Sequence, residues 1–262
     1  MTSIKALFVS ASLALLPAHS IQAQAIVGAW TYGNTATPDS GGAGVLVFLA
    51  NGAYFHAESE NTDGAEGGAN GMERGTYTWN AGTGAFTSAT AVDTNGEWGL
   101  FPDSPAFIDV TGNSLTIDDT TMTRVTGGSA IVGAWTYGNA LDPDETGTGV
   151  LIFLANGIYF HAESDNTADA ENGQDGMERG TYTWNADTGA FTAETIVNTN
   201  MEWGLSDEFP AFVTIDTDTL NVDGTLMTRI GAVPEPSTYT VLAGLGVLGA
   251  ALCRRRGKVK SN

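Results

Sequence analysis

Basic residues and cysteines are scarce in this chain of 262 residues, which has 10 Lys and Arg, 30 Asp and Glu, and one Cys. Nucleic-acid binding needs clustered Lys and Arg against the phosphate backbone, and a formal net charge of −20 argues against it. A single Cys excludes a disulfide framework within the chain and a thiolate metal cluster. Hydrophobic residues make up 42% of the chain, which argues against disorder and predicts one or two packed domains.

The first 25 residues have the three parts of a secretory signal peptide. Lys5 supplies the positive start, residues 6–16 form an apolar run, and Pro17 ends it before Ala23-Gln24-Ala25, a small-x-small cleavage pattern. A buried N-terminal helix is the alternative, but it does not account for the processing pattern that follows. We therefore expect export, with cleavage after Ala25 or after Ala23.

The C-terminal residues form a second ordered series of short signals. Pro234-Glu235-Pro236 is followed by an apolar run over residues 239–253 and by a basic cluster that begins with Arg254, Arg255 and Arg256. A helix over this run is about 22 Å long, shorter than the roughly 30 Å hydrocarbon core of a bilayer, so we expect a transient membrane helix. The basic cluster is expected to hold its end on the cytoplasmic side.

These three parts, in this order and at the end of the chain, resemble the PEP-CTERM sorting signal of Gram-negative bacteria. The resemblance implies recognition by an exosortase, a membrane-embedded transpeptidase-like protease, with processing near Pro234-Glu235-Pro236. It further implies export across the inner membrane and a role at the cell surface or in the extracellular polysaccharide matrix. The implied partners are the exosortase, the secretion machinery, the inner membrane during transit and matrix polysaccharide.

Between its two ends the chain is a tandem repeat. Residues 26–124 align with residues 131–229 without a gap, and 64 of the 99 paired positions carry the same residue. A unit of this size is a domain rather than one turn of a solenoid. The expected division is a signal peptide over 1–25, β domains over 26–125 and 131–230, a linker over 126–130, and a sorting tail over 231–262.

Each repeat has the pattern of short β-strands. Residues 45–50 form an apolar run that ends at Asn51-Gly52, a strong hairpin signal, and the returning strand over 53–59 places His56 and Glu58 on one face. Further strands are expected over 27–32, 73–80, 85–92, 107–110, 114–118 and 122–125. Seven or eight short strands per repeat predict an all-β fold of two tandem antiparallel domains, each a small up-and-down barrel or a sandwich.

The apolar runs over 45–50 and 150–155 have no polar face. A strand of this kind is normally covered on both sides. We therefore expect contact between the two domains, or with another chain.

A Gly-x-Trp motif opens each repeat and an Arg closes it. Gly28-x-Trp30 with Arg124, repeated as Trp135 with Arg229, is similar to the calycin (lipocalin-like) barrels. In that family an early Trp packs beneath an Arg from the end of the chain. The resemblance implies a structural role for both pairs.

Charge in the two repeats is almost entirely acidic. Residues 26–231 contain 29 acidic residues and four basic ones, all Arg. Such a surface repels anionic partners and attracts divalent cations. We expect each Arg to be the partner of a carboxylate or a lid over an aromatic ring.

One group of residues has the chemistry of a metal site. His56 and Glu58, repeated as His161 and Glu163, share a strand face, and Glu73 on a nearby strand could add a third ligand. The interpretation we favour is a neutral His bonded to Glu beside Tyr54. The acidic loops over 60–71 and 165–176 have the oxygen ligands that calcium needs, although a solvated loop is the simpler reading, and no other cofactor is expected.

The sequence contains no catalytic motif of a hydrolase, metalloprotease or nucleotide-binding enzyme. Glu97-Trp98 and its copy could present an aromatic ring to a sugar or be part of the core. Our expectation is a non-enzymatic matrix or surface protein, structural or adhesive. The alternative is a β-barrel module that binds a small ligand or calcium.

Overall fold

The computed structural model describes residues 25–38, 42–60, 70–96, 100, 107–117, 119–143, 147–165, 175–200, 205 and 212–231. In this part of the chain the regular structure consists of β-strands, which confirms the expected all-β fold. The expected signal peptide up to residue 24 and the expected C-terminal helix lie outside the described residues.

Each repeat contributes eight strands to one sheet. The first repeat has β1 (Gly28–Tyr32), β2 (Ala43–Phe48), β3 (Ala53–Ser59), β4 (Gly71–Trp79), β5 (Phe86–Asp93), β6 (Ile108–Thr111), β7 (Ser114–Ile117) and β8 (Thr120–Arg124). The second has β9 (Gly133–Tyr137), β10 (Thr148–Phe153), β11 (Ile158–Ser164), β12 (Gly176–Trp184), β13 (Phe191–Asn198), β14 (Val213–Asp216), β15 (Thr219–Val222) and β16 (Thr225–Arg229). The two sheets therefore begin and end at equivalent residues of the repeat.

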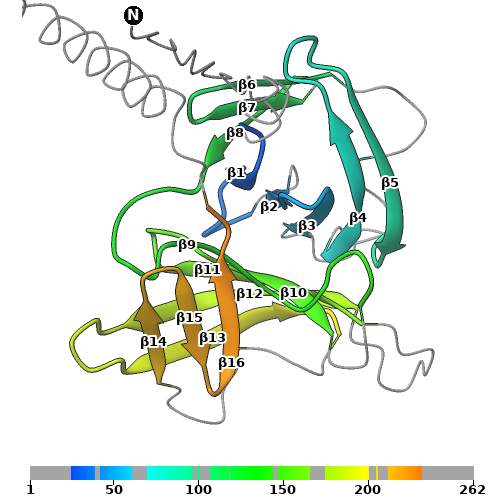
Figure 1. The fold of residues 1–262 in the computed structure, drawn as a ribbon. Coiled ribbons are helices and arrows are strands. Elements are labelled where there is room, and N and C mark those ends of the chain that lie inside the picture. The colour runs from blue at the N-terminus through cyan, green and yellow to red at the C-terminus, as the bar shows by residue number, and fades with distance from the viewer. Residues whose placement is uncertain are drawn as a thin grey trace, which may run out of the picture.

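Both sheets are antiparallel meanders that curl on themselves (Figure 1). The order β5-β4-β3-β2-β1-β8-β7-β6 places β5 and β6 at the two edges, and a bridge between Ala85 and Phe107 joins these edges at one end. The bridge between Ala190 and Phe212 does the same in the second repeat. This topology is that of an up-and-down barrel closed at one end, rather than of two facing sheets.

The interior of each curled sheet is filled with side chains. In the first repeat Phe48 meets Tyr77 edge-on, with ring centroids 4.7 Å apart, and Tyr77 stacks on Phe86 at 6.1 Å. Trp30, Leu46, Leu115 and other apolar residues complete this core, and the second repeat has an equivalent core of its own. Strand β5 is buried at Phe86 and then alternates between partly buried and exposed residues, as expected for a sheet with one packed face.

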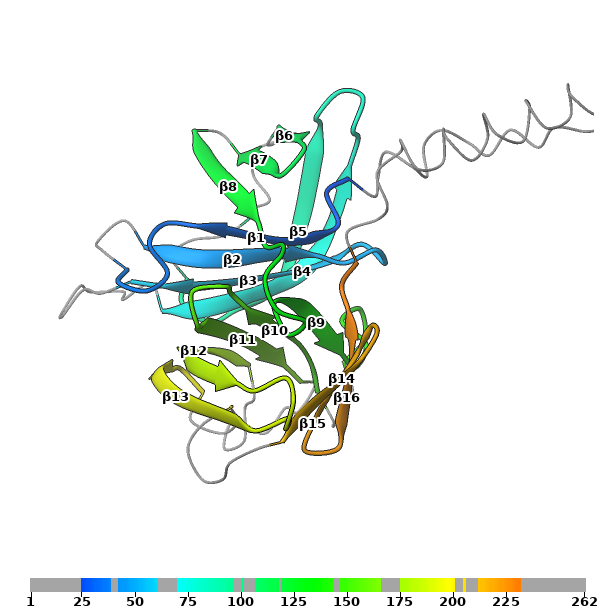
Figure 2. The ribbon, with the colours of Figure 1, turned by 90° about the vertical axis from the view of Figure 1, so that its left-hand side faces the viewer.

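A third hydrophobic core lies between the repeats. Figure 2 shows strands β1 to β4 lying over β9 to β12, and the side chains that point out of the two barrels meet there. Val47, Phe55, Ile152 and Phe160 in this core are each 0% exposed. Strands β2 and β3 are consequently buried at every residue, and the predicted contact between the domains is confirmed.

Two arginines cross this interface in reciprocal fashion. Arg74 Nε donates to Ser164 Oγ at 2.9 Å, and Arg179 Nε donates to Ser59 Oγ at 2.9 Å. The second contact of each Arg is a backbone carbonyl of the other repeat, Ala140 at 2.8 Å for Arg74 and Thr35 at 3.3 Å for Arg179. Equivalent residues make equivalent contacts, so the interface has the isologous character of a two-fold dimer within one chain. These hydrogen bonds go to hydroxyl and carbonyl oxygens, not to the carboxylate or aromatic partners expected from the sequence.

Candidate functional site

A buried polar cluster lies on the inward face of each sheet. The strand register places Tyr32 beside Gly44 and Gly44 beside Glu58, while His56 pairs with Glu73 on the next strand. His56, Glu58 and Glu73 are 9%, 4% and 2% exposed. Tyr137, His161, Glu163 and Glu178 are the equivalent residues of the second repeat. The cluster thus joins side chains from three strands, β1, β3 and β4.

Histidine in this cluster bonds to tyrosine. Tyr32 Oη and His56 Nε2 are 2.8 Å apart, and the copy, Tyr137 with His161, has a distance of 3.0 Å. Burial lowers the pKa of each His from 6.5 to about 4. Both imidazoles are therefore neutral at physiological pH, and the hydroxyl of the Tyr is the hydrogen-bond partner that the sequence analysis did not identify.

The carboxylates of the cluster are strongly desolvated. Burial raises the pKa of Glu58, Glu73 and Glu163 from 4.5 to about 7 in each case. Glu73 Oε2 accepts a hydrogen bond from the Leu100 amide at 3.1 Å, whereas Glu58 Oε2 and Glu163 Oε2 are buried without a hydrogen-bond partner. A buried carboxylate oxygen of this kind favours the protonated form.

Glycine at position 44 gives the cluster its space. A Cβ atom there would lie 2.7 Å from Tyr32 Oη and 2.4 Å from the Ala57 carbonyl oxygen. Any other residue would therefore push the Tyr32 ring away from His56. The same contact recurs at Gly149, where a Cβ would lie 2.6 Å from Tyr137 Oη.

His56, Glu58 and Glu73 do share the inward face, as the strand pattern predicted. Across the described residues, however, no group of three or more His, Cys, Asp or Glu side chains is arranged to hold a metal ion. Most of the acidic loops considered for calcium, residues 61–69 and 166–174, lies outside the described residues, as do Glu97 and Trp98.

The opening Trp and the closing Arg of each repeat meet face to face. The Arg124 guanidinium carbon lies 3.9 Å from the centroid of the Trp30 ring, and Arg229 lies at the same distance from Trp135. Arg124 Nη1 also donates to the Val27 carbonyl at 2.7 Å. Gly28 has a φ of 136°, which side-chain-bearing residues rarely adopt, and a Cβ atom there would also lie 2.6 Å from Arg124 Nη1, so both the backbone and the space favour Gly at this position.

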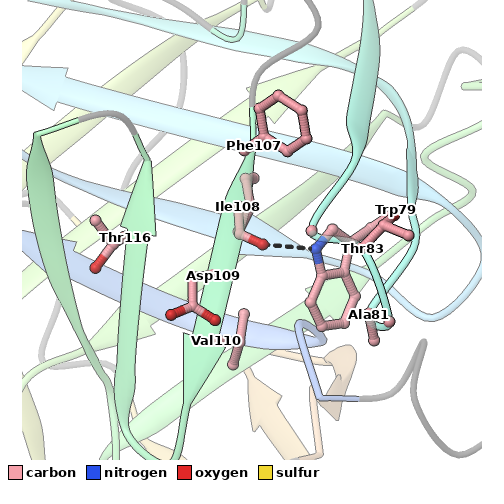
Figure 3. A pocket seen from close by; sticks show the side chains of 10 residues that line it. Trp79, Ala81, Thr83, Phe107, Ile108, Asp109, Val110 and Thr116 are labelled. Carbon is pink, nitrogen blue, oxygen red and sulfur yellow. Dashed lines mark hydrogen bonds between the residues drawn. The ribbon is translucent and has the colours of Figure 1, made fainter.

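A groove opens where the two edges of the first sheet meet (Figure 3). It has a volume of about 490 Å³ and lies between the β4–β5 turn and strand β6. The Trp79 indole nitrogen donates to the Ile108 carbonyl at 3.0 Å on one side of it. Phe107, on the rim, is 65% exposed.

Residues 232–256 match the family model of the PEP-CTERM protein-sorting motif, as the sequence analysis expected. The chain therefore carries a signal for export and for processing by an exosortase. Comparison with curated proteins and with solved structures gave no match for this chain. In the part of the chain that the structure describes, there is no helix long and apolar enough to cross a membrane.

Proposed function

We propose that the chain is a non-enzymatic protein of the cell surface or extracellular matrix of a Gram-negative bacterium. On this proposal the two repeats form one rigid body that acts by adhesion or by spacing the matrix. The sorting motif at residues 232–256 supports this destination, because processing by an exosortase near the motif would free the folded part from its membrane segment.

The burial of the polar clusters is the observation that carries the non-enzymatic part of the proposal. Glu58, Glu73 and their neighbours are the described side chains best suited to acid–base chemistry, with pKa values of about 7. Glu73 is nevertheless only 2% exposed, and a packed aromatic core fills the rest of the interior. A catalytic group must come within hydrogen-bond reach of its substrate, and these groups are sealed from any polysaccharide. Their arrangement supports a role in the structure of the barrel.

The test combines location and chemistry in the producing bacterium. We expect the wild-type chain in the surface or matrix fraction, and a variant with Pro234, Glu235 and Pro236 all changed to Ala in the membrane fraction. The exported protein should release no reducing ends from isolated matrix polysaccharide, and Glu58→Gln should leave its contribution to matrix cohesion unchanged. Release of sugar that Glu58→Gln abolishes would replace this proposal with a hydrolase.

A further inference from the structure

Phenylalanine at one rim position is exposed in both repeats. Phe107 and Phe212 are 65% and 63% exposed, and each forms the backbone bridge that joins the edges of its sheet. The other exposed large hydrophobic residues of the described chain have only a small or polar counterpart in the other repeat: Leu141, Ile196 and Leu226 correspond to Ala36, Ala91 and Thr121. The rim Phe is therefore a repeated feature of the surface.

Divergence between the repeats shows that burial does not explain this Phe. Among residues 107–117, only Phe107 and Leu115 are the same in the second repeat. Leu115 is 0% exposed and belongs to the barrel core, which accounts for its retention. Phe107 has no such reason, because the bridge to Ala85 uses only its backbone. Phe107 ends the retained run Pro105-Ala106-Phe107 and directly precedes residues 108–114, all of which differ between the repeats, and this retention supports a surface role.

The groove beside Phe107 combines an aromatic face with neutral and acidic polar groups. Thr83, Asp109 and Thr116 line it together with the half-buried Trp79 (Figure 3). No Lys or Arg is among the described residues that line it. An aromatic ring with a few polar groups around it suits a ligand that has both an apolar face and hydroxyl groups, which is the chemistry of a pyranose.

The charge of the protein restricts the class of saccharide. Residues 26–231 hold 29 acidic and four basic residues, and the two arginines at the repeat ends are held over Trp rings. The field of such a surface repels sulfated, phosphorylated or uronate-rich glycans. A neutral glycan carries no such penalty.

We propose that each repeat binds a segment of neutral polysaccharide at its rim, with Phe107 and Phe212 as the stacking surfaces and, in the first repeat, with the groove beside Phe107. The inference deepens the proposed function and rests on it, since it names the ligand class of an adhesive matrix protein. Two exposed rim rings on one chain can engage the same long polymer, so the second contact benefits from a high effective concentration.

Affinity electrophoresis of the exported protein tests the inference. The gels contain dextran, hydroxyethyl cellulose or galactomannan, and in parallel the carboxymethylated form of each. At least one neutral glycan should retard the wild type, and its carboxymethylated form should not. Phe107→Ala and Phe212→Ala should each weaken the retardation by roughly tenfold or more, and the double variant should lose it. Leu226→Ala, which removes an apolar side chain that is 64% exposed, is the matched control and should behave as the wild type.

Three results would overturn the inference: retardation by none of the neutral glycans, equal retardation by the carboxymethylated forms, or a double variant as retarded as the wild type. Because the rim side chains are exposed, both variants should keep the thermal midpoint of the wild type, so a loss of folding is detected separately. Recovery of the wild type from the matrix fraction despite a negative gel would leave the proposed function standing and reject only the groove.

Discussion

Strands β3 and β6 belong to the same sheet but differ in how much of each strand is buried. Every residue of β3 is buried, whereas β6 has one buried residue in four. The two repeats share six of seven residues in β3 and none in β6. Strand β3, which is packed on both faces, has thus hardly diverged, whereas β6, which is packed only on its inward face, has changed at every position. Packing on the second face, against the other repeat, is what separates the two regions.

The largest expected effect is at the interface between the repeats. Phe55→Ala removes a fully buried ring from the core that joins β3 to β11, and should lower the free energy of unfolding by about 3–5 kcal/mol. Thr121→Ala, on the exposed side of β8, should change it by less than about 0.5 kcal/mol. Urea denaturation measures both, and equal effects would contradict the distinction between two-sided and one-sided strands.

Arg74→Ala should have the next largest effect. It removes the hydrogen bonds to Ser164 and to the Ala140 carbonyl, and should cost about 2 kcal/mol. Arg74→Lys should recover little of this, because an ammonium does not reproduce the two-pronged geometry of the guanidinium. Arg179→Ala is the internal control and should match Arg74→Ala, since its contacts are the symmetry equivalents.

The buried Glu and His side chains on the inward face of the sheet should make the stability of the protein depend on pH, which exposed side chains on the outer face should not. The pKa of Glu58 is about 7 in the folded protein, against an ordinary value of 4.5 in the unfolded chain. Between pH 4.5 and pH 7 the folded protein therefore binds more protons than the unfolded chain does. The contribution of Glu58 to stability therefore falls as the pH rises from 4.5 to 7. His56 and His161, with pKa lowered to about 4, act in the opposite direction, since the unfolded chain binds their protons first as the pH falls below 6.5.

Glu58→Gln isolates the carboxylate from these opposing effects. We expect the urea midpoint of the variant minus that of the wild type to be larger at pH 8 than at pH 5. Glu194→Gln, which removes an exposed carboxylate on β13, should show no such difference. A shift of the Glu58→Gln midpoint that is the same at both pH values would contradict the assigned pKa.

A smaller effect is expected where the two clusters differ. Glu73 pairs with Asp93 across the strands, whereas Glu178 pairs with Asn198, whose amide donates to Glu178 Oε1 at 2.9 Å. Asp93 is one of the groups that raise the pKa of Glu73. Asp93→Asn should therefore stabilise the protein by about 1 kcal/mol at pH 8, because it removes a like charge and supplies a donor. An unchanged or lower urea midpoint would contradict this reading.

The smallest expected difference concerns one contact at the start of each repeat. Arg124 Nη2 donates to the Ala25 carbonyl, as Arg229 Nη2 does to that of Ala130. Cleavage after Ala25 would remove this acceptor and place the new ammonium of Ile26 beside the guanidinium. The exported chain should therefore begin at Gln24, which an intact mass measurement of its N-terminal peptide decides. A chain that begins at Ile26 would show that the contact is dispensable.

The strands could be predicted from the sequence because apolar alternation and the Asn-Gly turn are local signals. The strand expected over 85–92 is found as Phe86–Asp93, and the one over 27–32 as Gly28–Tyr32. The partners of most individual side chains could not be predicted, because they depend on strand register; the Trp30–Arg124 contact is the exception, and it came from the family resemblance. Tyr32 reaches His56 only through the pairing of β1 with β2 and of β2 with β3. The Arg74 contact with Ser164 depends on the packing of two separate sheets, which the sequence indicated only through the apolar runs over 45–50 and 150–155.

The isologous interface has a consequence for life outside the cell. Two separate chains that met through such a face would obey mass action and come apart as they were diluted into the surroundings. The short connection from β8 to β9 fixes the local concentration of each half around the other. The dimer-like body therefore keeps its shape however few molecules a cell exports.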